Sequence, residues 1–278
     1  RIDSLKSLLA ENYDAIFFVC CAPRGRDLDL PGRKEAAANI HIGIDWLSSV
    51  SFGHIDKIGK RVIVLGGGNT AMDCCRSSRR LGGDDVKVVV RSGFDEMKAS
   101  PWEKEDAMHE GIPIFNYLVP KEFTHANGKL TGVVFAKIDE RGRRQLLPTG
   151  EPDVVMECDD VLVAVGQENS FPWIERDIGI EFDQWGMPKV HSETMQSTLP
   201  NVFFGGDAAF GPKNIIWAVA RGHEAAVSID KHCQGEDAQQ RPAAGRARRA
   251  RRPRLRTLRA ALRRGPMCEL RRVLPRRV

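Results

Sequence analysis

The sequence predicts an α/β fold in which helices cover a parallel sheet and an antiparallel β-meander precedes the last strand. Residues 62–65 form an uninterrupted apolar run, VIVL, which is typical of a parallel strand covered on both faces. A glycine turn and a helical run at 71–83 follow it, and a second apolar strand at 86–90 completes a βαβ unit. Together these elements predict a Rossmann-like domain.

The glycine turn is the first candidate binding site. At Gly66 and Gly68 no Cβ blocks the approach of a pyrophosphate. The next helix would point its free N–H groups and the positive end of its dipole at this anion. Two polar residues can cap that helix, and an alanine takes the third small position of the G-x-G-x-x-G/A pattern. A glycine-rich turn of some other α/β protein is the alternative. The candidate residues are Gly66, Gly67, Gly68, Asn69, Thr70 and Ala71.

The second strand ends in Arg91 and Ser92, where folds that bind NAD usually carry an acid for the ribose 2′-OH. An arginine suits a 2′-phosphate, so we expect NADP(H), with NAD(H) as the alternative. Lys98 is a further candidate cation in the next loop. For both cations, a solvated surface side chain is the other interpretation.

The remaining elements follow from periodicity and turn residues. We expect helices at 4–12, 43–50, 101–110 and 215–232, the third capped by Ser100, and strands at 14–19 and 201–204. From 123 to 165 strands alternate with turn signals at 127–128 and 141–142, which predicts the antiparallel meander.

Two of these strands end in glycine at the edge where α/β sheets bind nucleotides. The strand at 160–165 leads into Gly166 and Gln167, and the strand at 201–204 leads into Gly206 and Asp207. Glycine allows a close approach, and a carboxylate there accepts bonds from ribityl or ribose hydroxyls. For Asp207 taken alone, a helix or turn cap is the favoured alternative.

The charge is unevenly distributed along the chain. The 278 residues have a formal net charge of +5, but residues 241–278 contain 15 arginines and one acid, Glu269, which gives +14 there and leaves −9 for the rest. Three interpretations of this tail stay open: a nucleic-acid or membrane-surface arm, a disordered solvated tail, and sequence translated out of frame. The lack of aromatic residues disfavours nucleic-acid binding.

Several classes of function are disfavoured. The longest apolar runs, such as 15–22, are too short to cross a bilayer, and no signal peptide is visible, so we expect a cytoplasmic protein. The seven cysteines include no C-x-x-C pair, and the seven histidines show no metal or triad spacing. We therefore expect no metal site and no hydrolase. The missing initiator methionine suggests a fragment or a processed form.

A family resemblance rests on five segments that occur in one order over about residues 3–235: NYDAIFF, APRGRDLDLPG, IGKRVIVLGGGNTAMDCCRSSRRLGG, DDVLVAVGQENS and STLPNVFFGGDAAFGPKNIIWAVARGHEAA. Together they resemble the small (β) subunit of NADPH-dependent glutamate synthase and its FAD-dependent pyridine nucleotide oxidoreductase relatives. The resemblance implies an NAD(P) domain inserted into an FAD domain. It also implies hydride transfer from nicotinamide to flavin, which needs no catalytic acid or base from the protein.

The resemblance also assigns residues. The turn at 66–71 would hold the NAD(P) pyrophosphate with Arg91 near its 2′ position, and Gly206 and Asp207 would bind the FAD ribityl chain. Asn214, Ile215 and Ile216 would form the helix start beneath the isoalloxazine. The implied organisation is a first FAD-domain segment at 1–58, an NAD(P) domain at 59–168, a returning FAD-domain segment at 169–236 and the arginine-rich tail at 237–278.

The chain departs from this family in three places. The family's FAD-pyrophosphate motif and its iron–sulfur cysteines would precede residue 1, Val19-Cys20-Cys21 replaces a usual Gly-Thr-Gly, and the arginine tail is foreign to the family. We therefore expect weak FAD binding by this chain, and iron–sulfur clusters only in a missing N-terminal region or a partner. The expected partner is a larger oxidoreductase subunit such as the glutamate synthase large subunit. The alternative function is a non-catalytic interaction or nucleic-acid-binding protein that uses the basic tail.

Overall fold

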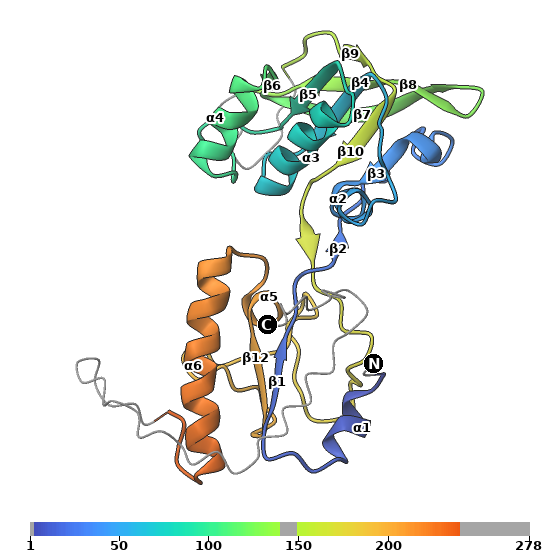
Figure 1. Cartoon of the computed structure of the whole chain (residues 1–278). Helices are drawn as coiled ribbons and strands as arrows, with labels where there is room; N and C mark the ends of the chain where they lie inside the picture. The colour runs from blue at the N-terminus through green and yellow to red at the C-terminus, as the bar shows by residue number, and fades with distance from the viewer. Residues whose placement is uncertain (1–2, 140–148, 240–278) are drawn as a thin grey trace, which may run out of the picture. The chain divides into compact units, whose positions relative to one another are not determined.

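A computed structural model describes residues 3–139 and 149–239 of the chain (Figure 1). These residues divide into two compact units, one formed by the described residues of 1–21 and 169–278, the other by those of 22–168. We call them unit 1 and unit 2. The basic tail from residue 240 onward and the expected turn at 141–142 lie outside the described residues.

Unit 2 is built on a five-stranded parallel sheet. The central strand β4 pairs with β10 on one side and β5 on the other, so that Val64 lies opposite both Leu162 and Val88. All neighbouring strands are parallel, which confirms the expected α/β class. The strand order is β3 (Ile40–Ile42), β10 (Asp160–Val163), β4 (Arg61–Leu65), β5 (Asp85–Val89) and β6 (Ile114–Phe115).

Both faces of this sheet are covered, which explains why β4 is apolar at every central position. On one face of the sheet, Val62 and Val64 share a buried cluster with Met72 of a helix. On the other face, Ile63 shares a cluster with Phe123 of the meander. The helical layer contains α2 (Gly43–Ser51), α3 (Asn69–Arg80) and α4 (Pro101–His109). The opposite layer is an antiparallel sheet of β7 (Leu118–Ala126), β8 (Lys129–Lys137) and β9 (Val154–Glu157).

The segment 22–58 belongs to unit 2, whereas the family resemblance implies that it continues the segment begun by residues 1–21. Its short strand β3 lies parallel to β10, with Ile40 opposite Val161. Two further short strands, β2 (Arg24–Gly25) and β11 (Gln167–Glu168), pair with each other in antiparallel orientation. Packing thus separates the units after residue 21, and the cofactor that each unit binds stays a prediction.

Unit 1 contains the parallel pair β1 (Ile16–Val19) and β12 (Val202–Gly205), with Ile16 opposite Val202. Around this pair lie α1 (Leu5–Leu9), α5 (Asp207–Phe210) and α6 (Ile215–Cys233). Phe18 and Phe204 lie opposite each other on the two strands, and their ring centroids are 5.4 Å apart with the ring planes tilted by 33°. The two strands and the long helix expected from the sequence are confirmed.

Within the two described stretches, no helix combines the length and apolar character needed to cross a membrane. The cytoplasmic location stays a prediction. The same stretches hold no group of three or more histidine, cysteine or acidic side chains placed to bind a metal ion.

Candidate functional site

Gly66 shapes the turn between β4 and α3. Its φ of +137° disfavours any side chain, and a Cβ built there would lie 2.2 Å from the backbone oxygen of Ala164. Its N–H donates to the carbonyl of Val89 at 3.0 Å. The residue therefore lets the chain pass between the ends of β10 and β5, so its lack of a side chain serves the packing of the strands themselves.

Gly68 has a different environment. Its φ is −101°, and a Cβ built on it would meet nothing within 4 Å. It is the N-cap residue of α3, and no side chain caps the helix. The first turn of α3 therefore directs its N–H groups and its positive dipole end toward open space, an arrangement that suits a phosphate.

The expected capping of α3 by Asn69 and Thr70 is wrong, because both residues already lie inside the first helical turn. Asn69 instead joins this turn to the loop after β5. Its Oδ1 accepts a bond from the Ser100 N–H at 2.8 Å, and its Nδ2 donates to Ser100 Oγ at 3.4 Å. Ser100 is the N-cap residue of α4, but its hydroxyl makes no cap bond, so its expected side-chain cap is wrong too.

Arg91 and Ser92 follow β5 at the same edge of the sheet. Arg91 is exposed, and among the described residues it has no carboxylate partner within ion-pair distance. The Ser92 carbonyl accepts a hydrogen bond from Asn116 Nδ2 at 2.9 Å, which fixes the backbone beside the arginine. A free cation on a fixed backbone suits a phosphate ligand.

The residues after β10 approach the start of α3. Gly166 has a φ of +130° and its carbonyl accepts from the Arg26 N–H at 3.0 Å. Gln167 Nε2 lies 3.5 Å from Thr70 Oγ1, at the outer limit of a hydrogen bond. The residues predicted at 66–71, 91–92 and 166–167 thus all lie at the carboxyl edge of the parallel sheet in unit 2.

The second predicted group lies in unit 1. Gly206 has φ +61° and ψ −145°, and a Cβ there would lie 3.3 Å from Val19 Cγ1. Asp207 is the first residue of α5, and its Oδ1 accepts from the Lys213 N–H at 3.1 Å. This carboxylate therefore closes the loop that leads into α6, which is the turn-capping role weighed for it above.

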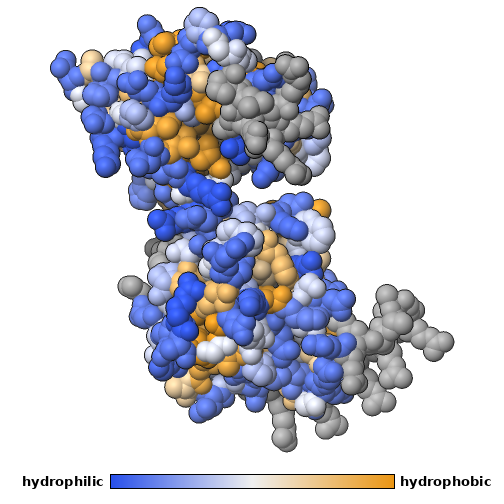
Figure 2. Space-filling model, turned by 180° about the vertical axis from the view of Figure 1, so that it is seen from behind, coloured by the Kyte–Doolittle hydropathy of each residue, from blue (hydrophilic) through white to orange (hydrophobic). Residues whose placement is uncertain are grey.

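The start of α6 agrees with the expected helix boundary. Asn214 Oδ1 caps the helix by accepting from the Trp217 N–H at 3.1 Å. The next two residues, Ile215 and Ile216, are 82% and 78% exposed. Figure 2 shows that apolar residues also gather in patches on one face of the molecule. Large apolar side chains this exposed suit contact with a flat ring system or another protein.

Asn169 is a polar residue with no role expected from the sequence. Its Nδ2 donates to the Asp207 carbonyl at 2.6 Å and to Met187 Sδ at 3.0 Å, while its Oδ1 is buried without a hydrogen-bond partner. Leaving such an acceptor unpaired costs about 1–3 kcal/mol. A ligand hydroxyl or N–H would remove that cost, so the residues around Asp207 fit a polyhydroxylic cofactor chain. No sequence pattern marks this environment.

The thiol of Cys20, just after β1, is not activated. Burial, together with the neighbouring Cys21 and Asp207, raises the pKa of Cys20 to about 11. The thiol is therefore protonated at neutral pH and is a poor nucleophile.

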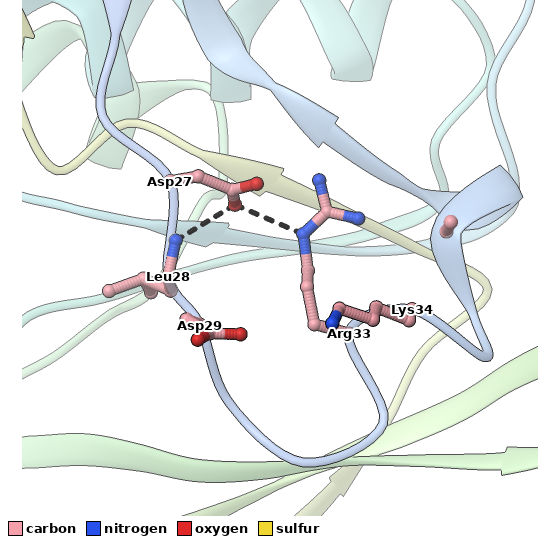
Figure 3. Close-up of a pocket in the computed structure, with 6 residues that line it drawn as sticks. Asp27, Leu28, Asp29, Arg33 and Lys34 are labelled. Atoms are coloured by element: carbon pink, nitrogen blue, oxygen red, sulfur yellow. Dashed lines mark hydrogen bonds and ion pairs between the residues drawn. The ribbon is translucent and has the colours of Figure 1, made fainter.

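A separate cavity of about 500 Å³ opens in unit 2 between residues 27 and 37 (Figure 3). Its wall carries both charges, and Asp27 Oδ1 already accepts from Arg33 Nε at 3.0 Å and from the Leu28 N–H at 2.8 Å. None of the residues predicted for nucleotide binding lines it. The cavity therefore does not contribute to the candidate site.

Comparison with known proteins identifies the family of the chain. The pyridine nucleotide-disulphide oxidoreductase family matches residues 10–222. Over 238 residues the chain is 32% identical to subunit beta of an NADP(+)-dependent formate dehydrogenase from Moorella thermoacetica, covering 83% of this chain and 33% of that protein. Over 232 residues it is 31% identical to a candidate NADPH glutamate synthase small chain from Cereibacter sphaeroides, covering 78% and 55%.

Solved structures show the same fold. Thioredoxin reductase from T. acidophilum superposes with a TM-score of 0.62 at 22% identity, over 80% of this chain and 66% of that one. The chain spans about a third of the formate dehydrogenase subunit, so it corresponds to only part of such a protein. The chain belongs to the pyridine nucleotide-disulphide oxidoreductase family, which confirms the family that its sequence resembles.

Proposed function

We propose that this chain is the electron-input part of a larger oxidoreductase, taking electrons from NAD(P)H through FAD to an iron–sulfur partner. The observation that carries the proposal is the uncapped start of α3 beside Gly68, which faces open space at the carboxyl edge of a parallel sheet. The names of two relatives, which specify NADP(+) or NADPH and a subunit role, support the same function.

In unit 2 the proposed ligand is NADP(H). The free N–H groups at the start of α3, beside the turn at 66–71, bind its pyrophosphate, and Gly166 and Gln167 border the same edge. Arg91 and Ser92 lie at the end of β5, where the ribose 2′ position is recognised in this fold. Because Arg91 is exposed and the fold's usual acid is absent there, we propose a preference for NADPH over NADH.

In unit 1 the proposed ligand is FAD. Gly206 and Asp207 border its ribityl chain, and Asn169 Oδ1 accepts a bond from it, which satisfies the buried oxygen. Asn214 begins the helix whose exposed Ile215 and Ile216 cover the ring system and exclude water. The bound cofactors supply hydride transfer from NAD(P)H to FAD and onward passage of single electrons, so the chain's residues bind and orient and none acts as an acid or base.

The partner is a subunit that carries iron–sulfur clusters. A glutamate synthase large subunit is one candidate, because a relative is named for that enzyme, and a formate dehydrogenase subunit is another for the same reason. Copurification of the natural complex, followed by identification of its other subunits, distinguishes these two partners.

Gly68→Ala tests the nucleotide site. A methyl group there meets nothing in the protein, so the unfolding free energy should stay within about 0.5 kcal/mol of the original chain. The same methyl would occupy the space of the pyrophosphate, so NADPH affinity measured by calorimetry should fall at least about tenfold. Unchanged affinity in the variant would contradict the assignment of this turn.

Electron input is tested separately. The chain with FAD in excess should reduce a one-electron dye with NADPH, faster than with NADH, and Arg91→Met should remove that preference without changing folding. Failure to reduce the dye at saturating FAD would contradict electron input, whereas an unchanged preference in the variant would contradict only the role of Arg91.

A further inference from the structure

The cavity between residues 27 and 37 is formed by a loop that is tied to the meander of unit 2. The Phe123 N–H donates to the Pro31 carbonyl at 2.9 Å, and a Cβ built on Gly32 would lie only 1.8 Å from the Phe123 oxygen. The N–H of the fully buried Ala36 donates to the Gly32 carbonyl at 3.0 Å. The loop is therefore ordered before any ligand arrives, and a ligand in the cavity has little loop entropy to remove.

Arg33 is oriented in the wall of this cavity by Asp27. Its Nε donates to Asp27 Oδ1 at 3.0 Å, and the same oxygen accepts from the Leu28 N–H at 2.8 Å. The Arg33 side chain is only 16% exposed, and its backbone N–H donates to the Leu30 carbonyl at 3.1 Å. Figure 3 shows that the other two guanidinium nitrogens point away from Asp27. The protein thus fixes the direction in which these two nitrogens can donate.

These two nitrogens, Arg33 Nη1 and Nη2, are unused donors. Across residues 3–139 and 149–239, neither has a hydrogen-bond or ion-pair partner, because the contact with Asp27 is made through Nε. Donors on a charged group that is largely buried gain free energy when an acceptor reaches them. The planar fork of a guanidinium matches the two oxygens of a carboxylate. Arg33 is therefore oriented to receive a carboxylate from a ligand in the cavity.

The same wall carries further charges of both signs. Asp29 and Lys34 line it and are exposed, and neither side chain has a hydrogen-bond or ion-pair partner in the described part of the chain. The four charged residues of the wall, two acids and two bases, sum to a formal charge of zero. A simple anion would meet as much negative as positive charge there, whereas a molecule that carries both charges can pair with each.

We propose that this cavity binds a free α-amino acid with an apolar side chain. Arg33 donates from Nη1 and Nη2 to the ligand's carboxylate with Lys34 as a second positive charge, and Asp29 accepts from its ammonium group. Leu28 and Ala37, the two apolar residues of the wall, contact its side chain. The volume of about 500 Å³ is in the range of small-molecule sites. The inference does not depend on the proposed function, since no residue of the nucleotide site lines the cavity.

The first test uses L-leucine and two analogues that each lack one of its charges. The analogue 4-methylpentanoate has no ammonium group, and 3-methylbutylamine has no carboxylate. Ligand-observed NMR measures their dissociation constants with the full chain. We expect leucine to bind at least about tenfold more tightly than either analogue, because each lost pair leaves a charged group of the wall without a partner. No saturable binding of leucine, or equal binding of leucine and an analogue, would overturn the proposal and leave the nucleotide site untouched.

The second test compares Asp29→Asn with Asp56→Asn, which changes another exposed aspartate of unit 2 that does not line the cavity. Asp29→Asn should weaken leucine binding about 5- to 20-fold without weakening the binding of 4-methylpentanoate, which has no ammonium group to lose. The control should change both affinities less than twofold. Both variants should melt at the original temperature, because both side chains are exposed.

Arg33→Lys keeps the positive charge but removes the fork, so it should weaken leucine and 4-methylpentanoate by similar factors. Should this variant fail to fold for want of the bond to Asp27, the pair of aspartate variants still decides the question. Leucine affinity within twofold of the original in Asp29→Asn, or an equal loss in Asp56→Asn, would refute the site.

Discussion

We expect Gly66→Ala to lower the melting temperature of unit 2 in the absence of any ligand, because the added methyl group would force two strands apart. The methyl group would lie 2.2 Å from the Ala164 oxygen, whereas ordinary contacts of this kind begin at 3.4 Å. The ends of β4 and β10 would have to move apart by roughly 1 Å, a misfit that costs about 1–3 kcal/mol in packed proteins. The hydrogen bond from the Ala164 N–H to the Leu65 carbonyl, 2.8 Å long, lies in the region that must move.

The backbone conformation adds a second cost. A φ of +137° is one that residues with a side chain rarely adopt, and holding one there costs about 1–3 kcal/mol. The two costs together come to about 4 kcal/mol. For a unit of this size each kcal/mol lowers the melting temperature by about 2–4 °C, so we expect a fall of roughly 10 °C.

The assay is thermal unfolding followed by circular dichroism, without nucleotide, with Gly68→Ala as the matched control. Both variants add one methyl group to the same turn, but only the one at Gly66 meets backbone atoms. Gly68→Ala should melt within about 2 °C of the original chain. If Gly66→Ala melted as late as its control, the explanation of Gly66 as a strand-packing residue would be refuted.

Two further predictions concern charge and thiols. Arg76→Met should destabilise the chain by about 1–2 kcal/mol at pH 7, because Arg76 binds Glu103 at 3.0 Å, Asp106 at 3.2 Å and Glu110 at 2.8 Å. Burial raises the pKa of Glu110, but bonds and charges from Arg76 and Arg80 outweigh it and hold that pKa below 4.5. The stabilisation is therefore present above pH 4.5 and lost as the pH falls through the lowered pKa, so denaturant titrations should show the two proteins converging in acid. In the second prediction, a thiol reagent at pH 8 should label Cys21 and Cys233, which are exposed in the native chain, and spare the three cysteines that are buried among the described residues until the chain unfolds. Mass spectrometry of the labelled peptides measures the result, and a buried cysteine labelled in the native chain would contradict the packing. The spared residues are Cys74, Cys75 and Cys158, whose pKa values burial raises, the last two to about 12.

The long strands of the parallel sheet were predictable because their burial on both faces requires consecutive apolar residues, which are visible in the sequence. The run at 62–65 has to be apolar throughout, since alternate residues meet helices on one side and the meander on the other. The strands β3 and β6 were missed because they contain three and two residues, too few to show any periodicity. The packing of residues 22–58 with unit 2 could not be read from the sequence for the same reason, since β3 pairs with β10 of that unit.

Side-chain partners distant in sequence were the other part that could not be predicted. Asn69 stands where a capping residue is expected, but its partner, Ser100, lies 31 residues away at the start of another helix. The pairing depends on how far the loop after β5 folds back, and no local pattern encodes that distance. Asn169 was overlooked for a similar reason, since its hydrogen-bond partner, the carbonyl of Asp207, lies 38 residues away.

The pair Gly66 and Gly68 shows how one motif combines two separate requirements. In the sequence both glycines satisfy the same pattern and both were explained by the approach of a phosphate. In the structure, one methyl group would collide with the neighbouring strand and the other would enter open space. The first glycine is therefore required for the fold before any ligand arrives, whereas the packing gives no reason for the second, which we propose serves a ligand. A chain that had lost nucleotide binding but kept its fold would be free to change the second and not the first. The presence of glycine at both positions thus argues that this chain still binds a nucleotide.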